Sequence, residues 1–304
     1  MVFSLTTLGT SAAGPTIERW PSGHFVKIHH RGLLLDCGEG IQIALQKAGI
    51  GQHSVDYVFI SHLHGDHTYG LPGVLNLWAL NGRNRPLTIF APEGLEEMIN
   101  TIFRINQARI PYPIHWKTTV YDDAPCVILE ETSFQVTTIP LNHRIPATGF
   151  LIREKPRLRN IRPEAITRWS IPFKEIPAIK AGAGWTHPDG TFLPHETLTV
   201  APAPPRSLAY CFDTRPHEAM LPVIQGVDVL FHEATFLHDL LDKAQHTGHS
   251  TARQAAETAQ RAGVKHLILG HFSARYLHLA ELLAEAQAVF PHSSLAAEGK
   301  VFEI

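Results

Sequence analysis

The chain has 304 residues, 44% of them hydrophobic and 18% charged, so it is an ordinary globular sequence, long enough for one large α/β domain or two small ones. Its formal net charge of −2 excludes an overall electrostatic attraction to nucleic acid but leaves a local basic patch open. No stretch reaches the roughly 20 apolar residues of a membrane span, and residues 1–4 lead straight into a strand pattern without a signal peptide, so we expect a cytoplasmic protein that does not contact membranes.

The N-terminal part is predicted to alternate strands with helices. Strands are expected at residues 2–8, 24–29, 32–36 and 57–60. The second and third form a hairpin through Arg31 and Gly32, and a helix at residues 41–48 ends at Gly49. Asp36 closes a buried strand, where a lone carboxylate is costly unless a partner compensates it. We expect it to orient a metal-binding histidine, and a helix cap or a turn is an equally weighted alternative.

The loop after the fourth strand carries four metal-ligand side chains within six positions. They are His62, His64, Asp66 and His67. Imidazole nitrogens and carboxylate oxygens suit zinc, iron or manganese, and the absence of a cysteine cluster argues against a purely structural zinc. Gly65 lets the backbone turn so that two pairs of side chains can face two ions. We therefore predict a dinuclear metal site; the alternative is a polar surface loop in a chain with 20 histidines.

Further helices and strands are expected after this loop. Helices are predicted at residues 71–80 and 93–104, and strands at residues 87–90, 114–120, 127–130 and 134–141. His143 follows the last of these strands almost at once. A lone histidine is usually structural, but this one stands where a ligand would stand.

Residues 153–203 interrupt this alternation. They are rich in Pro, Arg and Lys, and residues 153–180 contain eight basic and three acidic side chains, a local excess of five positive charges. We predict an inserted arm or an extended surface segment without a core of its own. A basic solvated face and a contact with nucleic acid are equally weighted interpretations of its charge.

Regular structure is expected again in the C-terminal third. Strands are predicted at residues 207–212, 227–231, 265–269 and 301–304, and helices at residues 251–262 and 275–289. Ser250 is the expected N-cap of the first of these helices. The first strand delivers Asp213 at its end, the second delivers His232 and Glu233, and the third delivers His271.

Metal-ligand residues thus follow apolar strands repeatedly, and ligands gather beyond the carboxyl ends of strands in α/β sheets. We assign His62, His64 and His143 to one ion. Asp66, His67 and His271 are assigned to the other, with Asp213 as the bridge between them. Two ions about 3.5 to 4 Å apart would activate a water as hydroxide and polarise a phosphoryl or carbonyl oxygen, which predicts hydrolysis without choosing the substrate.

The His-x-His-x-Asp-His motif with its three downstream ligands resembles the metallo-β-lactamase superfamily, and within it the chain resembles the ribonuclease Z family. Four local sequences carry the second resemblance: residues 35–40, 232–236, 248–251 and 269–276. The resemblance covers nearly the whole chain. It implies one α/β domain over residues 1–304, an αββα sandwich with residues 153–203 as a basic arm inserted in it.

The resemblance also implies roles for individual residues. Asp66 would accept the proton of the attacking water in addition to binding metal. Glu233 and His249 would orient and protonate the leaving 3′ oxygen. Ser273 and Arg275 would bind the scissile or a neighbouring phosphate, with a helix cap and a surface ion pair as their respective alternatives.

The implied function is a zinc-dependent endoribonuclease that cleaves the 3′ trailer from precursor tRNA, leaving a 3′ hydroxyl on the tRNA and a 5′-phosphomonoester on the trailer. Two Zn²⁺ ions per subunit and a homodimer are implied, with Mn²⁺ and Fe²⁺ open as alternatives. A hydrolase of a small phosphodiester, sulfate ester or lactone is the second hypothesis. A metal-bound RNA-binding protein without catalysis is the third, which the complete ligand set disfavours.

One departure from the family pattern concerns the arm. Bacterial members usually carry a Gly-Pro-containing tip that grips tRNA, whereas residues 144–212 of this chain contain no Gly-Pro dipeptide. The shape of the arm and its grip on tRNA are therefore open, although its positive charge suits a phosphate backbone.

Overall fold

The computed structural model describes residues 2–122 and 124–304, and the chain divides into two compact units. The large unit comprises residues up to 130, 136–152 and 206–304, and the small unit comprises residues 131–135 and 153–205. Within the described residues, no helix combines the length and apolarity needed to cross a bilayer.

The first sheet of the large unit has seven strands in the order β18-β1-β2-β3-β4-β5-β6. Their bounds are β1 Phe3–Gly9, β2 Gly23–Ile28, β3 Arg31–Leu35, β4 Tyr57–Phe59, β5 Leu87–Ala91, β6 Ile114–Thr118 and β18 Val301–Glu303. The strands β3 to β6 run parallel, and β1, β2 and β18 pair antiparallel with their neighbours. Four helices accompany this half of the unit: α1 Ile41–Lys47, α2 Gly65–Thr68, α3 Leu71–Leu80 and α4 Leu95–Ile105.

The second sheet also has seven strands, in the order β17-β16-β15-β14-β9-β8-β7. Their bounds are β7 Val127–Glu130, β8 Phe134–Pro140, β9 Thr148–Glu154, β14 Ser207–Cys211, β15 Val229–Glu233, β16 His266–Gly270 and β17 Ser293–Leu295. The helices of this half are η2 Glu218–Met220, α8 Leu221–Ile224, η3 His238–Leu240, α9 Leu241–Thr247, α10 Ala252–Ala262 and α11 Ala280–Gln287. The strands β14 to β17 are parallel.

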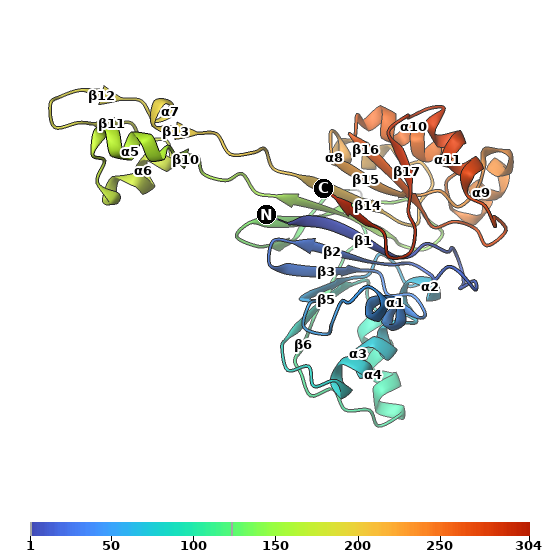
Figure 1. The fold of residues 1–304 in the computed structure, drawn as a ribbon. Helices are drawn as coiled ribbons and strands as arrows, with labels where there is room; N and C mark the ends of the chain where they lie inside the picture. Colours follow the sequence, from blue (N-terminus) through green and yellow to red (C-terminus); the bar gives the residue numbers. More distant parts are fainter. Residues whose placement is uncertain (1, 123) are drawn as a thin grey trace. The chain divides into compact units, whose positions relative to one another are not determined.

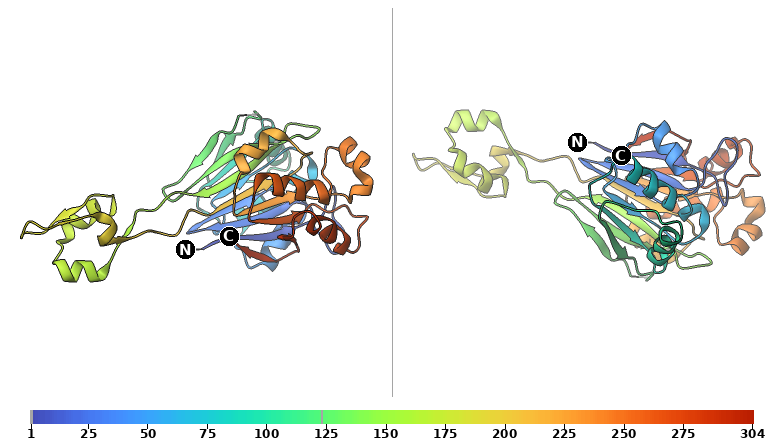
Figure 2. Two further views of the ribbon diagram at one scale, coloured as in Figure 1. Left: turned by 90° about the horizontal axis from the view of Figure 1, so that it is seen from above. Right: turned by 90° about the horizontal axis from the view of Figure 1, so that it is seen from below.

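The two sheets stack face to face, with helices on both outer faces (Figure 1). In the view from above, the orange and red helices lie in front of the sheets, and in the view from below the blue and teal helices do (Figure 2). One apolar cluster lies between the first sheet and its helices, another between the second sheet and its helices. Aromatic rings fill the space between the sheets: Phe59 stacks on Phe90 and contacts Phe150, and Tyr210 stacks on Phe212. The predicted αββα sandwich is confirmed.

Local sequence patterns predicted several elements well. The helix α3 has the predicted bounds and buries Leu71, Val74, Leu75 and Trp78. The predicted final helix was too long, because residues 275–279 are not helical and α11 begins at Ala280. The predicted N-cap of α10 was also wrong. Thr251 makes a capping box with Gln254, while the hydroxyl of Ser250 donates to the carbonyl of Thr214. The strand β9 was missed altogether.

The small unit contains short elements. They are β10 Asn160–Ile161, α5 Pro163–Trp169, η1 Phe173–Glu175, α6 Ile176–Lys180, β11 Trp185–Thr186, β12 Phe192–Leu193, α7 His195–Leu198 and β13 Thr199–Val200. The side chains of Ala165, Ile171, Ile179 and Leu198 form a small buried apolar cluster. The expectation of a segment without its own core is therefore wrong, since apolar residues far apart in the sequence meet here. That the unit is an arm inserted in one domain stays a prediction.

One buried cation organises the loops beside β4 and β5. Arg83 is 2% exposed, and its guanidinium carbon lies 5.3 Å from the ring centres of both Trp78 and Tyr112. Its guanidinium donates hydrogen bonds to the main-chain carbonyls of Gln52, Val55, Arg85 and Pro86. This single side chain therefore satisfies four buried or half-buried acceptors that the loops themselves leave open.

We predict that Arg83→Ala lowers the free energy of unfolding by about 3 kcal/mol, because it leaves carbonyl groups without donors and opens a cavity between two rings. Urea denaturation followed by circular dichroism measures this change. The control is Arg104→Ala on the exposed face of α4, expected to shift stability by less than about 0.5 kcal/mol. Equal stability of the two variants would contradict the assigned role.

Candidate metal centre

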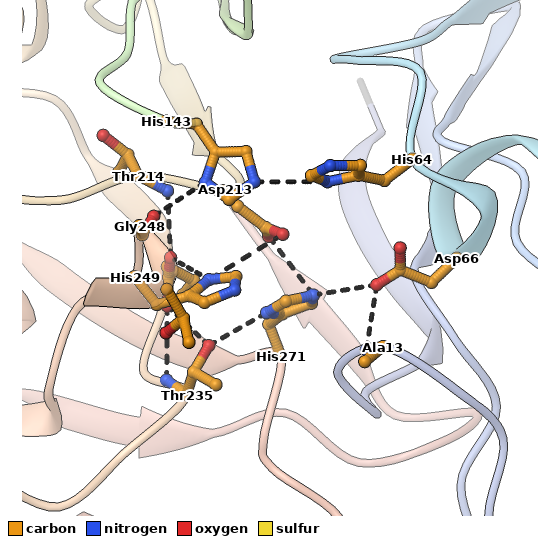
Figure 3. Close-up of polar contacts among 12 residues, drawn as sticks. Ala13, His64, Asp66, His143, Asp213, Thr214, Thr235, Gly248, His249 and His271 are labelled. Atoms are coloured by element: carbon orange, nitrogen blue, oxygen red, sulfur yellow. Dashed lines mark hydrogen bonds and ion pairs between the residues drawn. The ribbon is translucent and has the colours of Figure 1, made fainter. Parts of the chain in front are cut away.

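The candidate metal ligands come from loops at the carboxyl ends of strands in both sheets. His62 and His64 follow β4, and Asp66 and His67 lie on the one-turn helix α2. His143 follows β8, Asp213 follows β14 and His271 follows β16. Figure 3 shows His64, His143, Asp66, Asp213 and His271 converging from these separate segments. Residues that are up to about 200 positions apart in the chain therefore meet at one edge of the sandwich.

The first group consists of His62, His64, His143 and Asp213, whose ligand atoms all lie within 4.8 Å of one another. The Nδ1 atom of His64 lies 3.0 Å from Nε2 of His62 and 3.2 Å from Nε2 of His143. Burial and the neighbouring charge of His67 hold the pKa of His62 well below its usual value. Three imidazoles thus point nitrogen atoms at one small volume, an arrangement that can hold a divalent metal ion.

The second group consists of Asp66, His67, Asp213 and His271, whose ligand atoms also lie within 4.8 Å of one another. The Nε2 atom of His271 lies 3.2 Å from Oδ1 of Asp213 and 3.4 Å from Oδ2 of Asp66. Asp213, 2% exposed, belongs to both groups, so it is the residue that could contact both ions. The structure therefore gathers all seven predicted ligands, in the two sets expected from the sequence.

These donors fit divalent metal ions on their own chemistry. Nε2 of His67 and Oδ1 of Asp213 are buried and form no hydrogen bond among the described residues, although Oδ1 lies 3.2 Å from Nε2 of His271. A buried acceptor without a partner is costly, and a bound cation would compensate it. Two carboxylates, those of Asp66 and Asp213, face the same small volume as the histidine nitrogens, as in two-metal sites.

Asp36 lies directly behind the second group. Its fully buried carboxylate contacts Nδ1 of His67 at 2.8 Å and accepts hydrogen bonds from the main-chain nitrogen and the hydroxyl of Ser61, at 2.7 and 2.9 Å. The hydroxyl of Tyr210 donates to it at 2.6 Å. With Nδ1 of His67 engaged in this way, Nε2 faces the ligand group. The helix α1 has Gly40 at its N-cap, so Asp36 does not cap that helix.

Glu233 and His249 form an ion pair beside both groups, with 2.9 Å between Oε1 and Nδ1. Burial lowers the pKa of His249, but the carboxylates of Glu233 and Asp213 outweigh burial and raise it to about 9. Glu233 is the last residue of β15 and also accepts hydrogen bonds from the nitrogen of Thr214 and the hydroxyl of Thr235. The buried carboxylate thus fixes the imidazole ring of His249 and favours its protonated form.

Ser273 and Arg275 lie just beyond His271. Nε of Arg275 donates to Oγ of Ser273 at 3.1 Å, and the guanidinium of Arg275 lies 5.1 Å from the ring centre of Phe236. Since α11 begins at Ala280, Ser273 does not cap the last helix. Neither side chain belongs to the lining of the cavity over the ligand groups.

That cavity, of about 400 Å³, exposes polar residues that sequence analysis missed. Its lining includes Glu39, Tyr69 and Arg144 together with His64, Asp66 and His249. Arg144 directly follows the ligand candidate His143, and this adjacency is the signal that could have identified it. Thr235 was also missed, although it neighbours Glu233: its hydroxyl lies 2.6 Å from Glu233 and 3.0 Å from Nδ1 of His271.

Comparisons with known proteins agree with this geometry. A family profile described as anti-Pycsar protein Apyc1 matches residues 3–107, and one described as a β-lactamase superfamily domain matches residues 185–272. Ribonuclease Z of Porphyromonas gingivalis is 40% identical over 296 residues, which cover 97% of each chain. Ribonuclease Z of Bacteroides fragilis is also 40% identical, over 297 residues and again 97% of each chain.

Solved structures give the same result for the fold. The crystal structure of the short form of human tRNase Z matches 98% of each chain with a TM-score of 0.72 and 26% identity. The metallo-β-lactamase fold protein YhfI of Bacillus subtilis matches all of both chains at 0.69 and 20% identity, which shows the fold alone. This fold implies the use of divalent metal. From its relatives and its fold, the chain belongs to the ribonuclease Z family, whose members are hydrolytic endoribonucleases of the metallo-β-lactamase superfamily.

Proposed function

We propose that this protein cleaves the 3′ trailer from precursor tRNA with two bound Zn²⁺ ions, leaving a 3′ hydroxyl on the tRNA and a 5′-phosphate on the trailer. The observation that carries the proposal is the pair of four-residue ligand groups sharing Asp213, with the Glu233–His249 ion pair beside them. The names of the full-length relatives support tRNA as the substrate. A homodimer stays a prediction.

Each ion is assigned to one ligand group. His62, His64, His143 and Asp213 would hold the first, and Asp66, His67, Asp213 and His271 the second. Mn²⁺ and Fe²⁺ suit the same nitrogen and oxygen donors. When bound, the ions lower the pKa of water and neutralise charge on the phosphate. Asp36 serves this chemistry indirectly, by orienting His67.

Asp66 has two proposed roles of unequal weight. Burial raises its pKa, but the charge of His67 and the hydrogen bond from His271 outweigh burial and hold the pKa well below its usual range. A carboxylate with so low a pKa is a weak base, so its main role is metal binding. Accepting the proton of the attacking water is the secondary role, at the carboxylate that lines the cavity.

The ion pair is proposed to complete the cleavage. His249 lines the cavity and carries a proton at neutral pH because of its raised pKa, so it can donate this proton to the departing 3′ oxygen. Glu233 holds Nδ1 of His249 and thereby fixes the ring. Ser273 and Arg275, with a hydroxyl and a guanidinium in contact, are proposed to bind a phosphate next to the cleaved one.

The proposed function predicts release of a 3′ trailer when the purified protein with zinc is given a precursor tRNA, and loss of that activity after chelation of the metal. Gel electrophoresis with end-labelled RNA identifies the cleavage site and both termini. If micromolar enzyme hydrolyses a small ester rapidly but does not cleave the precursor tRNA, this proposal is contradicted and the small-molecule hydrolase is favoured instead.

We predict that His249→Ala keeps its metal but lowers kcat by about 10²-fold to 10⁴-fold, because the leaving oxygen loses its proton donor while both ligand groups stay complete. Metal content is measured by elemental analysis alongside the rate. The matched variant is His64→Ala, which removes a ligand and should lose metal and activity together. Loss of metal from the His249 variant as well would contradict its assignment as the acid.

The small unit is proposed to bind the tRNA backbone. The side chains of Arg162, Arg168 and Lys174 are exposed on α5 and its flanks. Such cations bind phosphates by releasing counterions, without reading base sequence. The small apolar cluster of this unit can support them on a folded surface.

We predict that replacing Arg162, Arg168 and Lys174 by Gln raises KM for precursor tRNA and flattens its dependence on salt, by up to three units in the slope of log affinity against log salt. Turnover of the small phosphodiester bis(p-nitrophenyl) phosphate reports on the metal centre alone, so the substitutions in the small unit should not change it. A matched control replaces Arg104, Arg253 and Lys265 of the large unit. An equal effect of both triple variants would show general electrostatics and not a specific contact.

A further inference from the structure

The large unit has a second cavity, which shares no lining residue with the cavity over the ligand groups. It has a volume of about 590 Å³ and is lined by two short segments, residues 16–19 and residues 274–278 without Arg275. This volume is in the range of pockets that hold small organic ligands. None of the roles assigned above uses this cavity.

The chain leads into both lining segments from residues at the candidate metal centre. Three positions before Thr16, the nitrogen of Ala13 donates to Oδ2 of Asp66 at 2.9 Å. Three positions before Ala274 stands the ligand candidate His271, and its neighbour Phe272 forms a bridge with Ser11. Each lining segment is therefore tied through a short stretch of chain to the residues around the metal ligands.

Two guanidinium groups meet between the ligand and the cavity. Nη2 of Arg19 donates to the carbonyl of Ser273 at 3.3 Å, and Nε of Arg275 donates to the hydroxyl of the same residue at 3.1 Å. Ser273 stands two positions after the ligand His271. Positive charge at this point suits the phosphate backbone of an RNA strand that leaves the reaction centre.

The cavity itself presents apolar and aromatic side chains to solvent. Leu277 is 83% exposed and Ile17 is fully exposed. The hydroxyl of Tyr276 accepts a hydrogen bond from the nitrogen of Leu237, so its ring is fixed in the wall. Exposed apolar side chains grouped in a cavity indicate a binding surface, because their contact with water is unfavourable until a ligand covers them. Nucleobases stack on aromatic rings beside cations, and Tyr276 offers such a ring between the aliphatic side chains of this cavity.

We infer that this cavity holds the nucleobase of a nucleotide adjacent to the cleaved phosphodiester. The inference rests on the proposed cleavage of RNA and adds a base-binding subsite to it. Ile17, Tyr276 and Leu277 contact the faces of the base, while Arg19 and Arg275 hold the backbone beside Ser273. Contact with base faces tolerates any sequence, which suits an enzyme that meets trailers of many sequences.

The test combines a protein variant with a change in the RNA. The variant is Ile17→Ser with Leu277→Ser, and the control is Leu80→Ser, another exposed leucine, 76% exposed at the end of α3. The substrates are an intact precursor tRNA and two versions lacking the base on either side of the cleaved bond. All rates are normalised to the turnover of bis(p-nitrophenyl) phosphate by the same protein.

The wild-type protein is expected to lose about tenfold in kcat/KM on one of the two base-free substrates. On the intact substrate, the double variant is expected to lose a similar factor in kcat/KM. On the base-free substrate that slows the wild type, the double variant should be as fast as the wild type, because removing the base and removing its contacts abolish the same interaction. The Leu80→Ser control should behave like the wild type on all three substrates.

Three results would overturn the inference. The first is a double variant that cleaves the intact substrate at the wild-type rate. The second is a double variant that loses as much activity on the base-free substrate as on the intact one, because the two losses would then be independent. The third is a double variant with a changed sedimentation coefficient, which would assign the surface to a contact between copies of this chain. A wild-type protein that hydrolyses the small ester but leaves intact precursor tRNA uncut would remove the proposed function as well. Cleavage of the intact precursor together with an unaffected double variant would remove only the subsite.

Discussion

The structure around the candidate metal centre depends on one buried carboxylate, Asp213, which faces both ligand groups. Its oxygens lie 3.2 Å from Nε2 of His271, 3.5 Å from Nε2 of His67 and 3.8 Å from Nε2 of His62. A buried carboxylate needs positive charge around it, and the charges of His271 and His67 hold its pKa well below the usual value although burial raises it. The other ligand candidates surround this carboxylate, and divalent cations held by neutral histidines would supply the same positive charge.

The same centre is tied to the stacking of the two sheets. Asp36 comes from the end of β3 in the first sheet, and Tyr210, which donates to it, lies on β14 in the second. The pair is fully buried, and Asp36 also holds His67. Burial raises the pKa of Tyr210, and the charge of Asp36 raises it further, so the phenol keeps the proton that it donates. Packing of the sheets and orientation of a ligand are therefore coupled through one hydrogen-bonded network.

Recognition of RNA, as proposed, is divided among three separate surfaces. The cavity over the ligand groups offers the polar and charged groups of the reaction, including Arg144 and His249. The second cavity offers apolar and aromatic side chains. The small unit offers exposed cations on a folded surface. Substitutions at each of these three places can therefore test its contribution to RNA recognition separately.

The sequence by itself determined what local patterns encode. Apolar strands followed by ligand-type side chains predicted all seven residues that the structure brings together in the two candidate ligand groups, and apolar residues at helical spacing gave α3 its bounds and its buried face. Only the tertiary structure decided which distant groups meet: Asp36 with Tyr210, Arg19 with Ser273, and the apolar residues of the small unit with one another. It also placed β9 inside the second sheet and showed that α11 begins at Ala280, five residues later than predicted. The physical reason is that long-range packing and burial select among local conformations whose intrinsic preferences differ little.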